Sequence, residues 1–61
     1  MLEIYHRRSS VEKITGLSRS LIYEMMAREE FPRPIRIGRR AVAWRESDIA
    51  EWQARCASDA A

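Results

Sequence analysis

The chain has 61 residues, of which 46% are hydrophobic and 33% charged, and its formal net charge is +2. A chain of this length forms one domain at most, and it buries only about 60% of the surface that its unfolded form exposes. With one cysteine and one histidine, it can build neither an internal disulfide nor a zinc site of two cysteines and two histidines. The composition therefore predicts a single domain, residues 1–61, that is held together by its hydrophobic core, with no metal and no cofactor.

Targeting signals are absent from the sequence. It contains no apolar run near the ~20 residues that a membrane-spanning helix needs, and no signal-peptide pattern opens it. The lone thiol also fits a reducing compartment. We therefore expect a cytoplasmic protein without a membrane partner.

The first predicted elements surround Gly16. Residues 2–5 alternate apolar and polar side chains and form either a short edge strand or an extended lead-in. Residues 9–12, Ser-Ser-Val-Glu, have the spacing of a capping box and predict the start of a helix. That helix ends near Thr15, because a glycine such as Gly16 adopts the left-handed conformation of a helix stop without strain.

A second helix and a hairpin follow. Ser18 is a capable N-cap for a helix over 18–28, which the prolines of the next segment prevent from continuing. Residues 35–44 then alternate apolar and polar side chains around Gly-Arg-Arg, which predicts a β-hairpin with arginines at its tip. Ser47 is the predicted N-cap of a last helix.

The order of helix, tight turn, helix, hairpin and helix predicts a mainly α fold with a small β-hairpin. Two helices joined by a two-residue turn have helix-turn-helix proportions, and a following hairpin makes the winged form. The tryptophans could stack on unpaired bases, but their apolar neighbours favour burial. The side chains expected in the core are Val11, Ile14, Leu17, Ile22, Met25, Met26, Phe31, Ile37, Val42, Trp44, Ile49 and Trp52.

The small net charge is unevenly distributed. Residues 1–30 are neutral, residues 31–45 hold five arginines and no acid, and residues 46–61 sum to −3. Ten of the 11 basic residues are arginine, whose planar guanidinium suits phosphate oxygens and guanine edges. A local arginine cluster indicates a nucleic-acid partner.

Several motifs resemble one known family. They are residues 11–20, Ile22-Tyr23, residues 31–34 (Phe-Pro-Arg-Pro), and Trp44 followed by Asp48-Ile49 and Trp52. Together they resemble the AlpA-type prophage regulators, of the wider MerR-like and excisionase-like winged helix-turn-helix group. The resemblance covers about residues 2–55. It implies a bacterial or phage-encoded, nucleoid-associated protein that binds specific double-stranded DNA as a transcriptional regulator; the alternative is an excisionase-like factor that bends DNA.

The helix over 18–28 is the expected recognition helix in the major groove. Arg19 and Ser20 lie in its first turn, where helix-turn-helix proteins read bases, and Tyr23 can give its hydroxyl to a phosphate. Ser18 caps the helix beside N–H groups that can hold a phosphate. Glu24 stands where sequences of this kind more often have a basic or polar residue; its carboxylate repels phosphate but can accept from a cytosine amino group.

The hairpin over 35–44 is the expected wing. Arg39 and Arg40 at its tip are predicted to follow the DNA backbone or to enter the minor groove. Arg36 alternates with two isoleucines, which places it on the outer face in support of the same patch.

Other functional classes are less well served by the sequence. No paired catalytic groups stand out, so we expect neither an enzyme nor a small-molecule ligand. MerR-like relatives dimerise through a long C-terminal coiled coil, which these residues lack, so we expect any self-association to be weak or cooperative along DNA. A protein-interaction module whose arginines bind an acidic partner is the alternative from another class.

Overall fold

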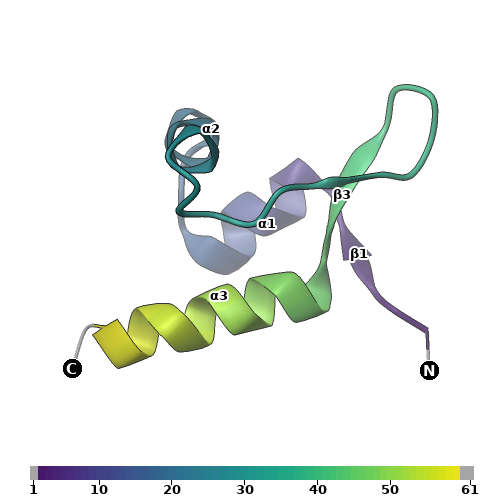
Figure 1. Cartoon of the computed structure of the whole chain (residues 1–61). Coiled ribbons are helices and arrows are strands. Elements are labelled where there is room, and N and C mark those ends of the chain that lie inside the picture. The colour runs from purple at the N-terminus through teal and green to yellow at the C-terminus, as the bar shows by residue number, and fades with distance from the viewer. Residues whose placement is uncertain (1, 60–61) are drawn as a thin grey trace.

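The structure, a computed structural model, describes residues 2–59. Its elements are β1 (Tyr5–His6), α1 (Arg8–Thr15), α2 (Arg19–Ala27), β2 (Ile35–Arg36), β3 (Val42–Arg45) and α3 (Glu46–Asp59). The three strands form an antiparallel sheet of order β1-β3-β2, and the loop between β2 and β3 projects beyond the helices (Figure 1). The predicted class, mainly helical with a small β-hairpin, is confirmed, and the arrangement is compatible with a winged helix-turn-helix. We call residues 35–44 the wing.

The turn between α1 and α2 follows the local sequence signals. Gly16 has φ 76°, and its N–H donates to the Glu12 carbonyl at 2.8 Å. Two residues later the Ser18 hydroxyl accepts from the Leu21 N–H at 3.2 Å, in the manner of an N-cap. The predicted helix stop and the predicted cap are both confirmed.

The predicted start of α1 is wrong. The helix begins at Arg8 with Arg7 as its N-cap, and no side chain caps it. Glu12, expected to reach back in a capping box, instead accepts from Arg8 Nε at 3.1 Å. The cause is tertiary, because β1 pairs with β3 up to His6 and the chain enters the helix directly after that strand.

The predicted cap of α3 is also wrong. The helix begins at Glu46, directly after β3, so Ser47 lies inside its first turn. Glu3 supplies the acceptor from the other end of the chain: its carboxylate accepts from the Ser47 hydroxyl at 2.7 Å and from the Ser47 N–H at 3.4 Å. The Ile4 carbonyl accepts the Glu46 N–H at 2.8 Å. The lead-in segment therefore caps α3.

This cap makes a pH-dependent contribution to folding. The hydrogen bond from the Ser47 hydroxyl holds the pKa of Glu3 below its usual range. Ionised Glu3 thus stabilises the fold above its unfolded-state pKa, and that contribution is lost as the pH falls through the folded-state pKa. We expect Ser47→Ala to raise the pKa of Glu3 in an NMR titration and Ser58→Ala, in the same helix, to leave it unchanged. An unchanged pKa in Ser47→Ala would contradict the assignment.

A Schellman motif ends α2. The Glu30 N–H donates to the Met25 carbonyl at 2.8 Å, and the Glu29 N–H donates to the Met26 carbonyl at 3.0 Å. Glu29 has φ 60°, the only positive φ at a non-glycine residue between residues 2 and 59. Glycine is the usual residue there, because a side chain is strained in the left-handed region.

We expect Glu29→Gly to stabilise the fold by about 0.5–1 kcal/mol, since relief of the strain exceeds the added entropy of the unfolded chain. Glu30→Gly is the matched control: it removes the same charge at a neighbouring residue whose φ is not positive. Urea unfolding followed by circular dichroism measures both. Equal shifts of the two midpoints would show that Glu29 carries no strain.

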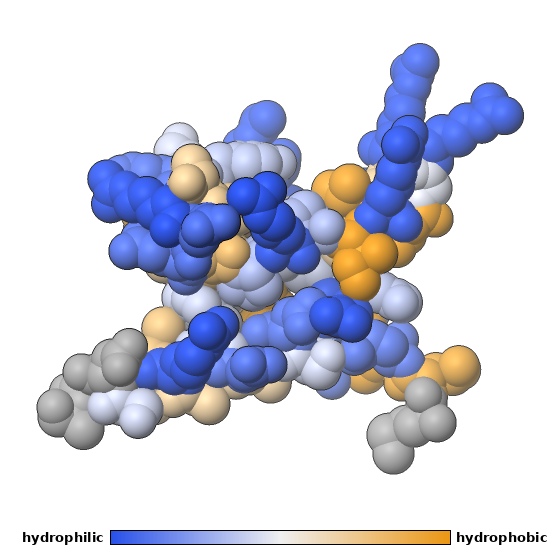
Figure 2. Space-filling view, viewed as in Figure 1, coloured by the Kyte–Doolittle hydropathy of each residue, from blue (hydrophilic) through white to orange (hydrophobic). Residues whose placement is uncertain are grey.

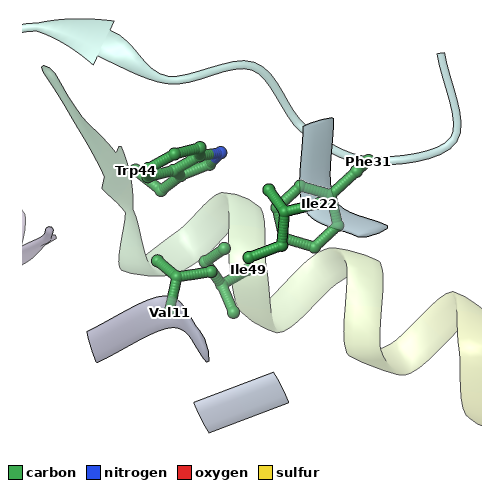
Figure 3. Packing of buried hydrophobic residues seen from close by; sticks show 5 residues of the cluster. All are labelled: Val11, Ile22, Phe31, Trp44 and Ile49. Atoms are coloured by element: carbon green, nitrogen blue, oxygen red, sulfur yellow. The ribbon is translucent and has the colours of Figure 1, made fainter. Parts of the chain in front are cut away.

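The core lies between the sheet, α1, α2 and α3. Figure 3 shows side chains from all of these layers converging, and the buried members are Val11, Ile22, Phe31, Trp44 and Ile49. Phe31 packs edge-to-face on Trp52 at 4.9 Å and on Trp44 at 6.4 Å between ring centroids. Trp44 Nε1 donates to the Pro32 carbonyl at 2.8 Å, and Trp52 Nε1 to the Glu30 carbonyl at 3.0 Å. Both tryptophans thus pack as predicted and fix the segment after α2.

Three predicted core residues are exposed instead: Ile14, Ile37 and Val42 have 40–48% of their surface accessible. Two of them, Ile37 and Val42, lie on the wing, whose loop projects beyond the helices (Figure 1). Ala43, in the central strand, is fully buried although its small side chain gave no signal. Alternation in the sequence thus predicts the strands without predicting how far the core extends along them.

Candidate nucleic-acid interface

The predicted contact residues of α2 are all exposed. They are Ser18, Arg19, Ser20 and Tyr23. The guanidinium carbon of Arg19 lies 5.9 Å from the centre of the Tyr23 ring, one helical turn away, in a cation–π arrangement. This contact restricts the Arg19 side chain without consuming its N–H donors, which remain available to a phosphate or a guanine edge.

Glu24 is exposed on the same helix but is paired. Its carboxylate lies 2.8 Å from Arg28 Nη2 in an i,i+4 ion pair. The spacing is one that helices stabilise, so the pair was readable in the sequence. The ion pair partly neutralises the carboxylate that α2 would otherwise present to a phosphate.

In the wing, one arginine holds the loop and two extend from it. Arg36 Nε donates to the Gly38 carbonyl at 3.2 Å, and Arg36 Nη2 donates to the Arg39 carbonyl at 2.6 Å. The side chains of Arg39 and Arg40 are exposed and make no ion pair within residues 2–59. Figure 2 shows hydrophilic side chains extending from the wing. Arg36 therefore holds the wing loop through these two hydrogen bonds, whereas the sequence predicted only that it supports the basic patch.

The fifth arginine of the cluster is directed elsewhere. Arg45 makes a bidentate pair with Asp48, with Nε to Oδ2 at 2.8 Å and Nη2 to Oδ1 at 3.1 Å. These hydrogen bonds raise the pKa of Arg45 above its usual value. The pair links β3 to the first turn of α3, so Arg45 contributes little free positive charge.

A cleft of about 300 Å³ joins α2 to the wing. Tyr23 and Arg40, predicted separately, both line it. The remaining lining consists of Arg7, Arg8, Ser9 and Val42. The sequence left the role of Arg7 and Arg8 open, because two arginines before the first predicted helix fit a contact with a flanking phosphate as well as a solvated lead-in. The structure thus brings α1, α2 and the wing together around one basic surface.

Other kinds of site are poorly supported. Between residues 2 and 59, no three histidine, cysteine or acidic side chains come together as metal ligands would. No helix in that part of the chain has the length and apolarity to cross a bilayer. A second hollow, of about 570 Å³, lies between the end of α2 and α3; it is lined by Met25, Glu29, Glu30, Phe31, Pro32, Trp52, Arg55 and Cys56.

Comparison with known proteins shows to which family the chain belongs. Residues 5–57 match the family described as prophage CP4-57 regulatory protein (AlpA). The chain belongs to the AlpA family. The match covers α1, α2, the wing and most of α3, and it includes every predicted contact residue.

A phage relative supports the membership in the AlpA family. The uncharacterized protein ORF88 of Enterobacteria phage P4 is 40% identical over 52 residues, which cover 85% of this chain. The same residues cover 59% of the phage protein, so the chain spans less than two thirds of its relative's length. The family is a phage regulatory one, and the resemblance inferred from the motifs is confirmed.

Proposed function

We propose that this AlpA-family protein is a transcriptional regulator that binds a specific sequence of double-stranded DNA, without catalytic activity. Residues 18–28 lie in the major groove, with Arg19 and Ser20 reading base edges, and the wing follows the backbone or enters the minor groove. Ser18 caps the recognition helix, and Arg36 holds the wing loop in place for Arg39 and Arg40.

One observation carries the proposal: the exposed face of α2 and the arginines of the wing are continuous. Tyr23 and Arg40 line the same cleft, and no acidic side chain lines it with them. A surface that combines a helix, a basic hairpin and a shared cleft fits two adjacent grooves of a duplex. The regulatory family supports the same class of function.

Titration of a fluorescent mixed-sequence duplex at several salt concentrations tests the proposal. We expect the logarithm of the binding constant to fall linearly with the logarithm of salt, with a slope near −0.9 for each phosphate contacted. Selection from a random duplex library should then enrich one site, bound in a single step by one protein or cooperatively when sites are repeated. Binding that is absent, or insensitive to salt, would overturn the proposal and favour an acidic protein partner.

A second candidate is an architectural factor that bends DNA. The wing carries Ile37 and Val42, which are 48% and 40% exposed beside the arginines. Architectural proteins insert apolar side chains of this kind between base steps and kink the duplex. Energy transfer between dyes at the two ends of the selected duplex distinguishes the candidates: a shortened end-to-end distance on binding supports bending, and an unchanged distance excludes it.

A further inference from the structure

The cleft between α1, α2 and the wing has the chemistry of an anion site. Arg7 and Arg8 come from the start of α1, Tyr23 from α2 and Arg40 from the wing, and the cleft has a volume of about 300 Å³. Guanidinium groups and hydroxyls are the donors that proteins use for phosphate oxygens. Three arginines and no acidic residue line the hollow, so its lining favours an anion.

The ion pairs of the chain leave these donors available. Arg8 is the one cleft arginine that has a carboxylate partner, Glu12, at 3.1 Å. Arg7 and Arg40 make no ion pair within residues 2–59. In addition, no side chain caps α1 and no acidic residue lies in its first turn, so the positive end of that helix dipole is not compensated at the cleft.

The position of the cleft identifies the anion. If α2 lies in the major groove and the wing reaches the minor groove, one sugar–phosphate strand must pass between them, because that strand separates the two grooves. The cleft occupies this place, between Tyr23 of α2 and Arg40 of the wing. Val42, 40% exposed, supplies an apolar wall beside the donors that suits a deoxyribose.

We infer that the cleft binds a backbone phosphodiester of the DNA strand that runs between α2 and the wing, with Arg7, Tyr23 and Arg40 as its donors. This inference rests on the proposed function. It assigns Tyr23 to the sugar–phosphate backbone of the DNA and leaves base reading to the first turn of α2. It also adds Arg7 to the DNA interface. A phosphate held from three elements would fix the register of the whole domain on the duplex.

The test uses the full chain and the duplex selected by the wild type. Arg7→Gln removes one cleft charge, Arg7→Lys retains it, and Arg55→Gln removes an equal charge from the other hollow. We expect Arg7→Gln to reduce the magnitude of the salt slope by about 0.9, and Arg7→Lys and Arg55→Gln to leave it unchanged. Tyr23→Phe should weaken binding about 2- to 10-fold at constant slope, because it loses one neutral hydrogen-bond donor.

A scan with single methylphosphonate linkages, each of which removes one phosphate charge, locates the contact. One linkage should weaken binding by the wild type but have little further effect on Arg7→Gln, because both changes remove the same interaction. Thermal unfolding of each variant checks that the fold is retained. If Arg7→Gln unfolds, Tyr23→Phe tests the site, because the same linkage should then have less effect on Tyr23→Phe than on the wild type.

The outcomes separate the two proposals. If the wild type does not bind duplex DNA, the proposed function fails. If it binds but Arg7→Gln matches Arg55→Gln and no linkage couples to Arg7, the cleft inference is overturned and the proposed function stands. If inorganic phosphate shifts the amide signals of the cleft in the wild type but not in Arg7→Gln, while DNA binding is equal, the cleft is a small-anion site and the inference is also overturned.

Discussion

Replacing Trp44 with alanine is expected to unfold the domain. Trp44 is completely buried, packs on Phe31, and donates from its indole N–H to the Pro32 carbonyl. Loss of a large core aromatic costs about 3–5 kcal/mol. A folded chain of 61 residues has a total stability of about 3–9 kcal/mol, so the loss takes most or all of it.

Circular dichroism during urea and thermal unfolding measures this effect. Trp44→Phe, which keeps an aromatic ring but leaves the Pro32 carbonyl without its donor, should remain folded and lose about 1–3 kcal/mol. Trp52→Ala is the control at a partly buried position, and we expect a smaller loss than for Trp44→Ala. Similar cooperative transitions in Trp44→Ala and Trp52→Ala would show that the core does not depend on Trp44.

The features predicted correctly from the sequence are those that neighbouring residues determine. Gly16 ends α1 because of its own backbone freedom, and Ser18 caps α2 through a bond that spans three residues. The change from a helical to a strand period, after the prolines, likewise needs no tertiary information. The order of the elements could therefore be predicted, and with it the helix-turn-helix class.

The errors arise where distant segments meet. Both wrong helix starts were predicted from serines, at residues 9–10 and at Ser47. In the structure, α1 begins directly after a strand that pairs with β3, and α3 is capped by Glu3, 44 residues away from Ser47 in sequence. Local sequence cannot show such contacts. Likewise, alternation predicts Ile37 and Val42 as strand residues, but it does not show that both side chains are exposed in the folded chain.

The candidate interface likewise has features that the sequence predicts and features that it does not. Arg19, Arg39 and Arg40 were predicted from position and charge, and the structure leaves them exposed. The cleft could not be predicted, because Arg7, Tyr23 and Arg40 are separated by 16 and 17 residues in sequence and meet only in the folded chain. The carbonyl contacts of Arg36 also depend on the folded loop.

Removing three exposed arginines together, Arg19→Ala, Arg39→Ala and Arg40→Ala, is expected to weaken binding to mixed-sequence duplex DNA about 100- to 1,000-fold at ~0.1 M salt. The magnitude of the salt slope should fall by about 1.8, which corresponds to one phosphate contact each for Arg39 and Arg40, because Arg19 is assigned to base edges. The fold should survive. None of the three side chains is buried or ion-paired within residues 2–59, and the Arg39 carbonyl that accepts from Arg36 belongs to the backbone, which alanine retains.

A second triple variant separates an interface from general charge attraction. Lys13→Ala, Arg45→Ala and Arg55→Ala also change the formal net charge from +2 to −1, but none of these residues lines the cleft or the exposed face of α2. We expect this control to retain most of the affinity and slope of the wild type. Equal losses of affinity in the two variants would mean that DNA binding depends only on net charge. At a specific surface, the loss must depend on which three positive charges are removed. If the first variant bound DNA as tightly as the wild type does, any DNA contact would lie outside α2 and the wing.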